Sequence, residues 1–434
     1  MFALSSIGSI QDIFIYLAPI EEFMKVLVEA YGCTLNRGEA QEFQEGLLAR
    51  GHELVEGEQE AEAFVIFTCG VIETTERHML KRIGYMAGYP EKKLMVCGCL
   101  GAINPDAIKK VAPNAVVFHA AEQALALDGF EFLESPTVSS KQVSAVGILP
   151  ISTGCIGSCT YCITRKARGM LVSRSPGEIA SRLEGLVGTG RAEIQLCAQD
   201  TAIYGQDIGT DLKALVQRLE TVPGNYMMRI GMMNPANVKE QLHSILEAYD
   251  SPRVFKFLHL PAQSGSDSVL QGMGRNHTAA DFAETVGAFR SRFPELALST
   301  DIIVGFPGET DDDFEASIEL VKVIRPDIIN ITRFSARPGT AAAEMTDKVP
   351  GGTAKERSRQ LTGLRFAITG ENYNKYMGQT VSALATERRK PGSTFLRTVD
   401  YRPVVVDRDI DLGKWHTLEI TGASKTHLVA VLND

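Results

Sequence analysis

The chain has 434 residues, of which 44% are hydrophobic and 22% charged, and 44 Lys and Arg against 53 Asp and Glu give a net charge of −9. These proportions are typical of a globular protein and exclude collagen-like, coiled-coil and disordered classes. At about 150 residues per domain, the length predicts about three domains. An acidic chain does not attract nucleic acid over its whole surface, so such a partner would need a local basic patch.

Neither a membrane span nor a secretory signal is expected. The longest apolar stretch, around residues 63–72, is far shorter than the roughly 18 residues that cross a bilayer. The first residues include Asp12 and lack a basic n-region. We therefore expect a cytoplasmic protein with no membrane partner. In that reducing compartment its eight cysteines indicate metal or redox chemistry.

Residues 25–120 alternate short apolar runs with helical patterns. The apolar runs lie at 25–32, 63–71, 93–99 and 115–120. Continuous apolar strands separated by helices predict a parallel sheet covered on both faces. Cys33, Cys69 and Cys99 each stand at the end of a run, at the sheet edge where ligands bind, so the three thiols should converge. Cys97 competes for the third place, but the Gly-Cys pair at the strand exit favours Cys99, with Cys97 pointing into or across the sheet.

A second alternation begins near residue 148, after a polar stretch at 135–142 that predicts a linker. Six strand candidates follow, at 148–154, 192–200, 226–233, 254–261, 296–306 and 328–335. Six βα units predict a partial TIM-like barrel, two units short of eight. Polar and glycine-rich loops follow the strands, on the face that carries the chemistry in barrels.

The C-terminal part predicts a helix at about 354–376 and then short strands between 377 and 432. Such a run of short strands indicates a small all-β barrel, a fold often used for oligonucleotides. The expected fold class is α/β with this all-β addition. The expected divisions are an extension 1–23, an N-terminal parallel-sheet domain 24–125, a linker 126–147, a barrel domain 148–370 and a β domain 371–434.

The sharpest motif is Cys-Ile-Gly-Ser-Cys-Thr-Tyr-Cys, in which Cys155, Cys159 and Cys162 follow the first barrel strand. Thiolates suit either zinc or an iron–sulfur cluster. A closed structural zinc site takes four protein ligands, whereas three cysteines leave one iron of a [4Fe–4S] cluster open to a substrate. We favour the cluster, with zinc as the alternative. Tyr161, before the third cysteine, can pack a nucleoside.

With these motifs in place, the chain resembles the methylthiotransferase family of radical S-adenosylmethionine (SAM) enzymes. The matching segments are 31–36, 68–71, 98–99, 154–162, 167–169, 199–201, 229–235, 258–267, 300–309 and 337–340. Bacterial members usually carry Pro two residues after the third cysteine, where this chain has Thr164, so the archaeal and eukaryotic branch fits better. Such chains usually begin at the equivalent of Met24, which makes residues 1–23 a native extension or a wrongly assigned start.

The resemblance implies two [4Fe–4S] clusters, an auxiliary one on Cys33, Cys69 and Cys99 and a radical SAM one on Cys155, Cys159 and Cys162. It implies two SAM molecules per turnover, one to methylate a sulfide at the auxiliary cluster and one cleaved to a 5′-deoxyadenosyl radical. The branch installs a 2-methylthio group on N6-threonylcarbamoyladenosine at position 37 of tRNA. The implied partners are the tRNA anticodon loop, an electron donor such as a ferredoxin or flavodoxin, and a sulfur source. The C-terminal β domain corresponds to the family's OB-like TRAM domain.

The SAM-contacting residues are expected in the loops after the strands. Gln199 and Asp200 stand where the superfamily usually contacts the SAM amino group, with a turn-stabilising role as the alternative. Gly305 would let the backbone approach the adenine, and simple turn chemistry is its alternative. Ser264 and Gln263 would meet the ribose or the carboxylate.

Basic residues of the β domain are the expected RNA contact. Arg388, Arg389 and Lys390 form the best phosphate-binding patch, although a charge run is often only a solvated loop. The basic run at 164–168 favours tRNA over the nearest rival substrate, a side chain of a ribosomal protein. A second rival is a non-catalytic iron–sulfur electron carrier with a nucleic-acid-binding domain, which would not need the loops of a barrel.

Overall fold

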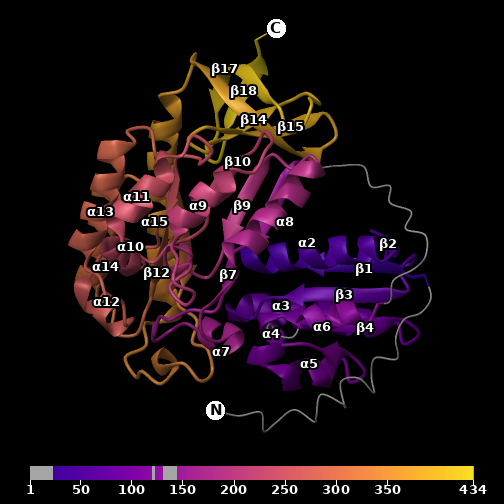
Figure 1. Ribbon diagram of the computed structural model, residues 1–434. Helices are drawn as coiled ribbons and strands as arrows, with labels where there is room; N and C mark the ends of the chain where they lie inside the picture. Colours follow the sequence, from indigo (N-terminus) through magenta and orange to yellow (C-terminus); the bar gives the residue numbers. More distant parts are fainter. Residues whose placement is uncertain (1–22, 120–122, 131–143, 434) are drawn as a thin grey trace. The chain divides into compact units, whose positions relative to one another are not determined.

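The computed structural model describes residues 23–119, 123–130 and 144–433, drawn as a ribbon in Figure 1. Residues 1–22 of the predicted extension and 131–143 of the predicted linker lie outside the described residues. The chain divides into two compact units. The first consists of residues 1–141 and 163–169, and the second consists of residues 142–162 and 170–434. Segment 163–169, expected in the barrel domain, thus groups with the first unit.

A five-stranded parallel sheet in the order β2-β1-β3-β4-β5 forms the centre of the first unit. The strands are β1 (Lys25–Ala30), β2 (Glu53–Leu54), β3 (Ala63–Thr68), β4 (Lys93–Gly98) and β5 (Val116–Val117). The helices are α2 (Thr34–Ala49), α3 (Glu73–Met86), α4 (Cys99–Ile103), α5 (Pro105–Val111), α6 (Gln123–Asp128) and α7 (Thr164–Arg168). The predicted parallel α/β domain is confirmed.

Helices bury both faces of this sheet, which explains why its strands have continuous apolar sequences. Every residue of β3 is buried. On one face Phe64 belongs to a cluster with Ile83 of α3. On the other face Phe67 meets Phe43 of α2 edge-on, with ring centroids 5.6 Å apart.

Six parallel strands form the barrel part of the second unit, as expected. They pair as β10-β9-β6 and β11-β12-β13, and a parallel bridge between Met228 and Val254 joins the two sets. The strands are β6 (Val146–Pro150), β9 (Glu193–Cys197), β10 (Met227–Ile230), β11 (Phe257–His259), β12 (Ala297–Val304) and β13 (Ile328–Arg333). A short antiparallel pair, β7 (Ser152–Thr153) with β8 (Val172–Ser173), follows β6.

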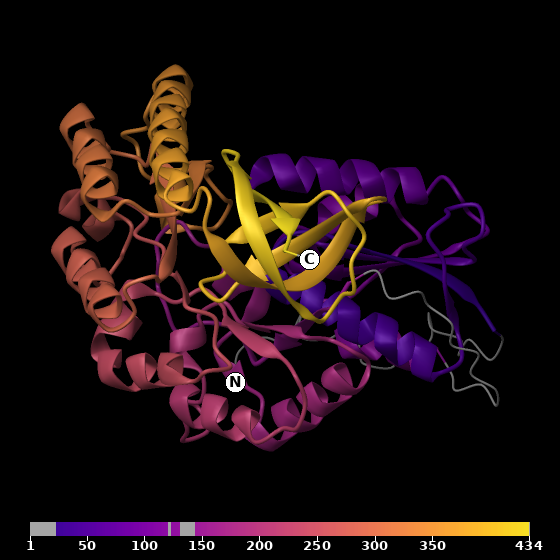
Figure 2. The same ribbon diagram turned by 90° about the horizontal axis from the view of Figure 1, so that it is seen from above.

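Helices alternate with these strands and lie in an arc outside them (Figure 2). They are α8 (Pro176–Gly188), α9 (Leu212–Glu220), α10 (Pro235–Glu240), α11 (Leu242–Asp250), α12 (Asp267–Gly272), α13 (Ala279–Arg292), α14 (Asp311–Ile324) and α15 (Gly351–Asn374), with 3₁₀ turns at Thr201–Ile203 and Ala341–Ala343. Local capping chemistry starts several of them. Ser175 Oγ accepts the N–H of Glu178 at 3.2 Å, with Pro176 in the first turn of α8.

The C-terminal strands close into the small barrel β14-β15-β16-β18-β17, confirming the all-β prediction. They are β14 (Thr380–Lys390), β15 (Ser393–Thr398), β16 (Pro403–Val406), β17 (Trp415–Ala423) and β18 (Leu428–Leu432). Tyr401 joins this barrel to the six-stranded one, since its hydroxyl donates to Glu193 and accepts from Gln195 Nε2 at 3.2 Å. Its ring centroid lies 4.9 Å from that of Phe257. None of the described helices is both long enough and apolar enough to cross a membrane.

Candidate active site

Three cysteines of the first unit stand at one edge of its sheet. Cys33 follows β1 and precedes α2, Cys69 follows β3, and Cys99 opens α4 directly after β4. Because β1, β3 and β4 are parallel neighbours, their carboxyl ends meet at the same edge. Burial raises the pKa of the Cys99 thiol to about 11, and the thiols of Cys33 and Cys69 also act to raise it. Cys33 and Cys69 therefore both lie within electrostatic reach of Cys99.

Two glycines let the loops that carry these cysteines pack closely. Gly32 has φ +95°, and a Cβ added there would lie 2.5 Å from Cys69 Cβ and 3.0 Å from its Sγ. Gly98 has φ +86°, and its added Cβ would lie 2.4 Å from the carbonyl oxygen of Thr68. A side chain at either position would push the cysteine loops apart.

Cys97 occupies the core of the sheet and Cys99 the functional edge. Cys97 has no exposed surface and packs in the cluster that contains Phe43 and Phe67. Cys99 instead packs with Ile163 and Ala167 of segment 163–169. This placement supports the choice of Cys99 as the third member of the trio.

The second trio lies in the loop between β7 and α7. Cys155 Sγ accepts the N–H of Gly157 at 3.2 Å. Burial is the main factor that raises the pKa of Cys155, and the thiols of Cys162 and Cys159 add to it. Cys159 and Cys162 thus lie close enough to Cys155 to act on its thiol electrostatically.

An arginine and two aromatic rings stand beside this second trio. Arg275 Nη1 donates to Cys159 Sγ at 3.6 Å, and its Nη2 donates to the carbonyl of Pro261 at 3.2 Å. The ring of Tyr161 packs edge-on against Phe306, with centroids 6.5 Å apart. The site therefore has a cation at one sulfur and an aromatic wall next to the third cysteine.

Two buried amide oxygens near these loops have no protein partner among the described residues. They are Gln199 Oε1 and Gln263 Oε1. A buried acceptor without a donor costs free energy, so each is suited to a hydrogen bond from a bound molecule. Both are predicted SAM contacts, and Gln263, at φ +72°, holds a conformation that glycine normally takes.

The other predicted SAM contacts have protein partners. Asp200 Oδ1 accepts backbone N–H groups of Ala202 and Asn234, both at 3.1 Å, and Oδ2 accepts from Asn237 Nδ2 at 2.6 Å. Burial raises the pKa of Asp200. These contacts give Asp200 the turn-stabilising role considered as its alternative. Ser264 Oγ lies 3.3 Å from Ser317 Oγ and accepts the N–H of Ser266 at 3.1 Å.

Gly305 approaches a helix closely. Its N–H donates to Glu309 Oε2 at 2.6 Å. At φ +76°, a Cβ added there would lie 2.7 Å from Cβ of Ala354 in α15. Packing and turn chemistry therefore already require glycine at this position.

Three polar side chains meet on adjacent strands, and none is among the predicted site residues, although His259 and Asp301 lie in the matching segments 258–267 and 300–309. His259 Nε2 lies 3.2 Å from Asp301 Oδ1, which also accepts from Asn330 Nδ2 at 2.7 Å. Burial acts to raise the pKa of Asp301. His259, Asn330 and Arg275 lower it by more, so the pKa lies below its ordinary value. The sequence places a polar residue inside each of three apolar strands, and the alignment of these residues depends on strand register.

The predicted RNA patch lies at the exposed end of β14. Arg388 Nη2 donates to the carbonyl of Ile410 at 2.9 Å, while Arg389 pairs with Glu387 at 2.6 Å and lies 3.9 Å above the ring of Phe395. Lys390 ends the strand and is exposed. The two guanidinium groups are thus held in place, and their outer faces remain accessible.

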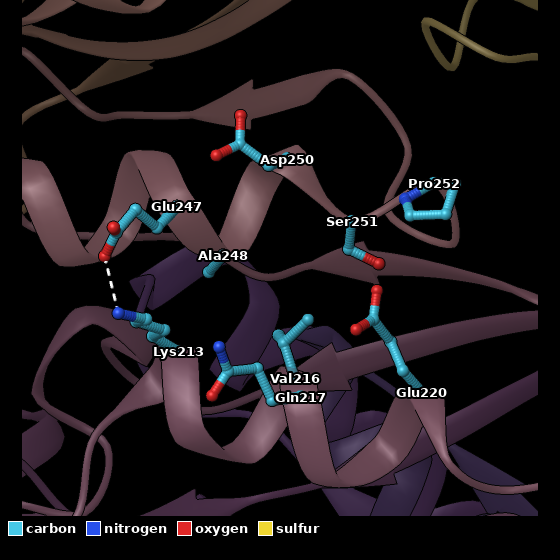
Figure 3. A pocket seen from close by; sticks show the side chains of 9 residues that line it. All are labelled: Lys213, Val216, Gln217, Glu220, Glu247, Ala248, Asp250, Ser251 and Pro252. Carbon is cyan, nitrogen blue, oxygen red and sulfur yellow. Dashed lines mark ion pairs between the residues drawn. The ribbon is translucent and has the colours of Figure 1, made fainter.

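A hollow of about 400 Å³ lies elsewhere, between α9 and α11. Figure 3 shows the Lys213–Glu247 ion pair of 2.7 Å on one side of it, with Glu220 and Asp250 nearby. No residue predicted for the active site lines it.

The donor sets of both trios fit an iron–sulfur cluster. No three His, Cys, Asp or Glu side chains of the described part of the chain are placed to hold a single metal ion. The ligands of a [4Fe–4S] cluster are arranged differently from those of a single metal ion. Each thiolate binds a different iron, so the cysteine sulfurs are farther apart than they are around one ion. One cysteine of each trio also accepts from an arginine, Cys99 from Arg168 and Cys159 from Arg275, and such hydrogen bonds are typical around cluster sulfurs.

Comparison with known families agrees with this arrangement. The Radical SAM superfamily matches residues 149–321, and a family described as uncharacterized protein family UPF0004 matches residues 25–119. The chain is thus a radical SAM enzyme. Proteins named probable threonylcarbamoyladenosine tRNA methylthiotransferase from Pyrococcus horikoshii and Archaeoglobus fulgidus are each 39% identical, covering 94% of this chain and 99% of the relative. The threonylcarbamoyladenosine tRNA methylthiotransferase of Drosophila melanogaster is 34% identical over 94% of this chain and 78% of its own. The chain belongs to the threonylcarbamoyladenosine tRNA methylthiotransferase family.

Solved structures show the same fold at low identity. The radical S-adenosylmethionine methyltransferase TsrM from Kitasatospora setae has a TM-score of 0.54 at 13% identity, covering 74% of this chain and 77% of that one. The cobalamin-dependent S-adenosylmethionine radical enzyme OxsB has a TM-score of 0.51 at 11% identity, covering 83% and 60%. These likenesses concern the fold alone.

Proposed function

We propose that this enzyme installs a 2-methylthio group on N6-threonylcarbamoyladenosine at position 37 of tRNA. One observation carries the proposal: the chain is 39% identical over 94% of its length to a protein of that name. Two trios of cysteines in loops that follow strands support it. An electron carrier would not need the second trio to sit among the loops of a six-stranded barrel. The relatives' names also favour tRNA over a ribosomal protein side chain.

The cysteines divide between two [4Fe–4S] clusters. Cys33, Cys69 and Cys99 hold the auxiliary cluster, and Cys155, Cys159 and Cys162 hold the radical SAM cluster. When bound, the clusters and SAM supply the radical that activates the C–H bond and the methylthio group that replaces the hydrogen. Three protein thiolates at each site leave one position open for a small ligand.

The other residues of the second site bind and orient. Gln199 and Gln263 present unpartnered buried oxygens to which the amino or hydroxyl groups of SAM would donate. Asp200 fixes the turn that carries Gln199, and Arg275 holds Cys159. Tyr161 and Phe306 form an aromatic wall that can pack a nucleoside and exclude water.

The C-terminal barrel binds the tRNA. Arg388, Arg389 and Lys390 would bind phosphates of the anticodon region, which adds affinity without reading sequence. A ferredoxin- or flavodoxin-like electron donor and a sulfur source complete the reaction, in the cytoplasm. The functional divisions that we assign are residues 24–125 for the auxiliary cluster, 148–370 for radical SAM chemistry and 371–434 for RNA.

Nucleoside mass spectrometry tests this function. tRNA from a host that makes N6-threonylcarbamoyladenosine but lacks its methylthio derivative is digested after expression of the enzyme. We expect the 2-methylthio nucleoside with the wild type and with Cys197→Ala, a buried strand cysteine outside both trios, and none with Cys155→Ala or Cys33→Ala. A methylthio group found on a ribosomal protein instead would contradict the proposal.

A further inference from the structure

Arg168 is a buried cation beside the auxiliary trio. It ends α7, its side chain exposes 1% of its surface, and its segment folds as part of the first unit (Figure 1). The sequence reading counted it in a basic run that favours RNA, but a buried guanidinium cannot meet phosphate. Burying this charge is costly unless it is paired and hydrogen-bonded, so its partners define its role.

The partners of Arg168 are a thiol, an amide and a carboxylate. Nε donates to Cys99 Sγ at 3.2 Å, Nη2 donates to Asn36 Oδ1 at 3.1 Å, and Nη1 pairs with Glu39. Glu39 and Asn36 both belong to α2. Glu39 and Asn36 therefore hold the two Nη groups of the planar guanidinium, and its Nε–H points at the sulfur of Cys99.

Asn36 extends this network to the other two cysteine loops. Its Nδ2 donates to the carbonyl of Tyr31 at 2.5 Å, two residues before Cys33, and lies 3.3 Å from the carbonyl of Thr68, next to Cys69. The loop of each cysteine is thus tied to one polar pair, Asn36 with Arg168. An ion pair between Arg168 and Glu39 would not require these contacts. They connect the two side chains to the loops of all three cysteines.

We propose that Arg168 is a positioning residue of the auxiliary site that orients the Cys99 sulfur through an N–H···S hydrogen bond and so raises the reduction potential of the cluster. The inference rests on the proposed function, which assigns the cluster to Cys33, Cys69 and Cys99. Reduction adds negative charge to an already anionic centre. The N–H···S hydrogen bond from Arg168 stabilises the reduced form, because hydrogen bonds to sulfur are known determinants of cluster potential. Glu39 offsets the charge of Arg168, so the hydrogen bond carries the effect.

The experiment measures iron content and midpoint potential of the auxiliary cluster alone. The parent is the full chain with Cys155→Ala, Cys159→Ala and Cys162→Ala, reconstituted anaerobically and titrated with dithionite under EPR. Arg168→Met removes the charge and the donor. Arg168→Met with Glu39→Gln removes both members of the buried pair and leaves no uncompensated charge, which protects folding. Lys166→Gln is the matched control, an exposed cation on the same helix.

We expect the parent and Lys166→Gln to hold about four iron with equal potentials. In the paired variant the iron stays and reduction becomes at least tenfold less favourable, which is a fall of about 59 mV for a one-electron couple. Arg168→Lys, which keeps the charge but loses the planar fork, should lie between. A paired variant with full iron and the parent's potential overturns the proposal, as does loss of iron in that variant, which would make the role structural. A parent without iron refutes the auxiliary site itself, a separate outcome from failure at Arg168.

Discussion

The substitution Gly32→Ala tests the close packing of the auxiliary cysteine loops. At φ +95° an L residue is strained by about 1–3 kcal/mol. The new Cβ would lie 2.5 Å from Cys69 Cβ, whereas carbon atoms pack at about 3.5–4.0 Å. The loops must separate by roughly 1 Å, and overpacking of this kind adds about 1–3 kcal/mol. The total of about 2–6 kcal/mol is a large part of the 5–15 kcal/mol that stabilises a typical domain.

The assay is urea unfolding of the full-length apoprotein, combined with an iron count of the reconstituted parent that lacks the radical SAM cysteines. We expect a lower unfolding midpoint and a loss of most of the auxiliary iron. Gly84→Ala in α3 is the control, because its nearest neighbour would be Val111 Cβ at 3.6 Å. A double-mutant cycle with Cys69→Gly, which removes the clashing Cβ, isolates the contact. Unchanged iron and an unchanged midpoint in Gly32→Ala would refute the close packing.

Three other predictions concern the second unit. Tyr401→Phe leaves the buried Glu193 without one donor and should cost about 1–3 kcal/mol of stability in urea unfolding; a change within error would contradict the joining role of this tyrosine. Burial and the Arg275 cation lower the pKa of His277 to about 4 from 6.5. The unfolded chain therefore binds this proton more tightly, and up to about 3 kcal/mol of stability is lost as pH falls from 6.5 to 4. His277→Gln should flatten that slope, so an unchanged slope in this variant would rule out His277 as the cause. Replacing Arg388, Arg389 and Lys390 with Ala should weaken tRNA binding and reduce its slope in log salt by at most about 2; Lys414→Ala, on the same barrel, is the control, and an unchanged slope removes the patch from the interface.

Much of the architecture could be predicted because its signals are local. Apolar runs of strand length marked β3 and β4, and the cysteines directly after strands implied convergence, since parallel strands end at one edge. The spacing of Cys155, Cys159 and Cys162 indicated a cluster without any tertiary knowledge. The Ser-Pro start of α8 was equally readable, because capping involves only neighbours in sequence.

The features that could not be predicted depend on long-range packing. Arg168 lies in a basic run, and nothing local distinguishes its buried guanidinium from the exposed Lys166. Its burial follows from segment 163–169 packing on α4, more than sixty residues earlier in the chain. The contact of Asp301 with His259 and Asn330 likewise depends on strand register. The hydrogen bonds of Asp200 also depend on packing, because they join it to Asn234, which follows the next strand of the barrel.

Counting iron and sulfide per chain after anaerobic reconstitution distinguishes an enzyme with two clusters from one with a single cluster. We expect about eight iron in the wild type and in Cys97→Ala. We expect about four in the Cys33→Ala/Cys69→Ala/Cys99→Ala variant and about four in the Cys155→Ala/Cys159→Ala/Cys162→Ala variant. Four or fewer in the wild type, with none left when the second trio is removed, would contradict a cluster at the first trio and with it the methylthio transfer. Loss of iron in Cys97→Ala but not in Cys99→Ala would reverse the assignment of the third ligand.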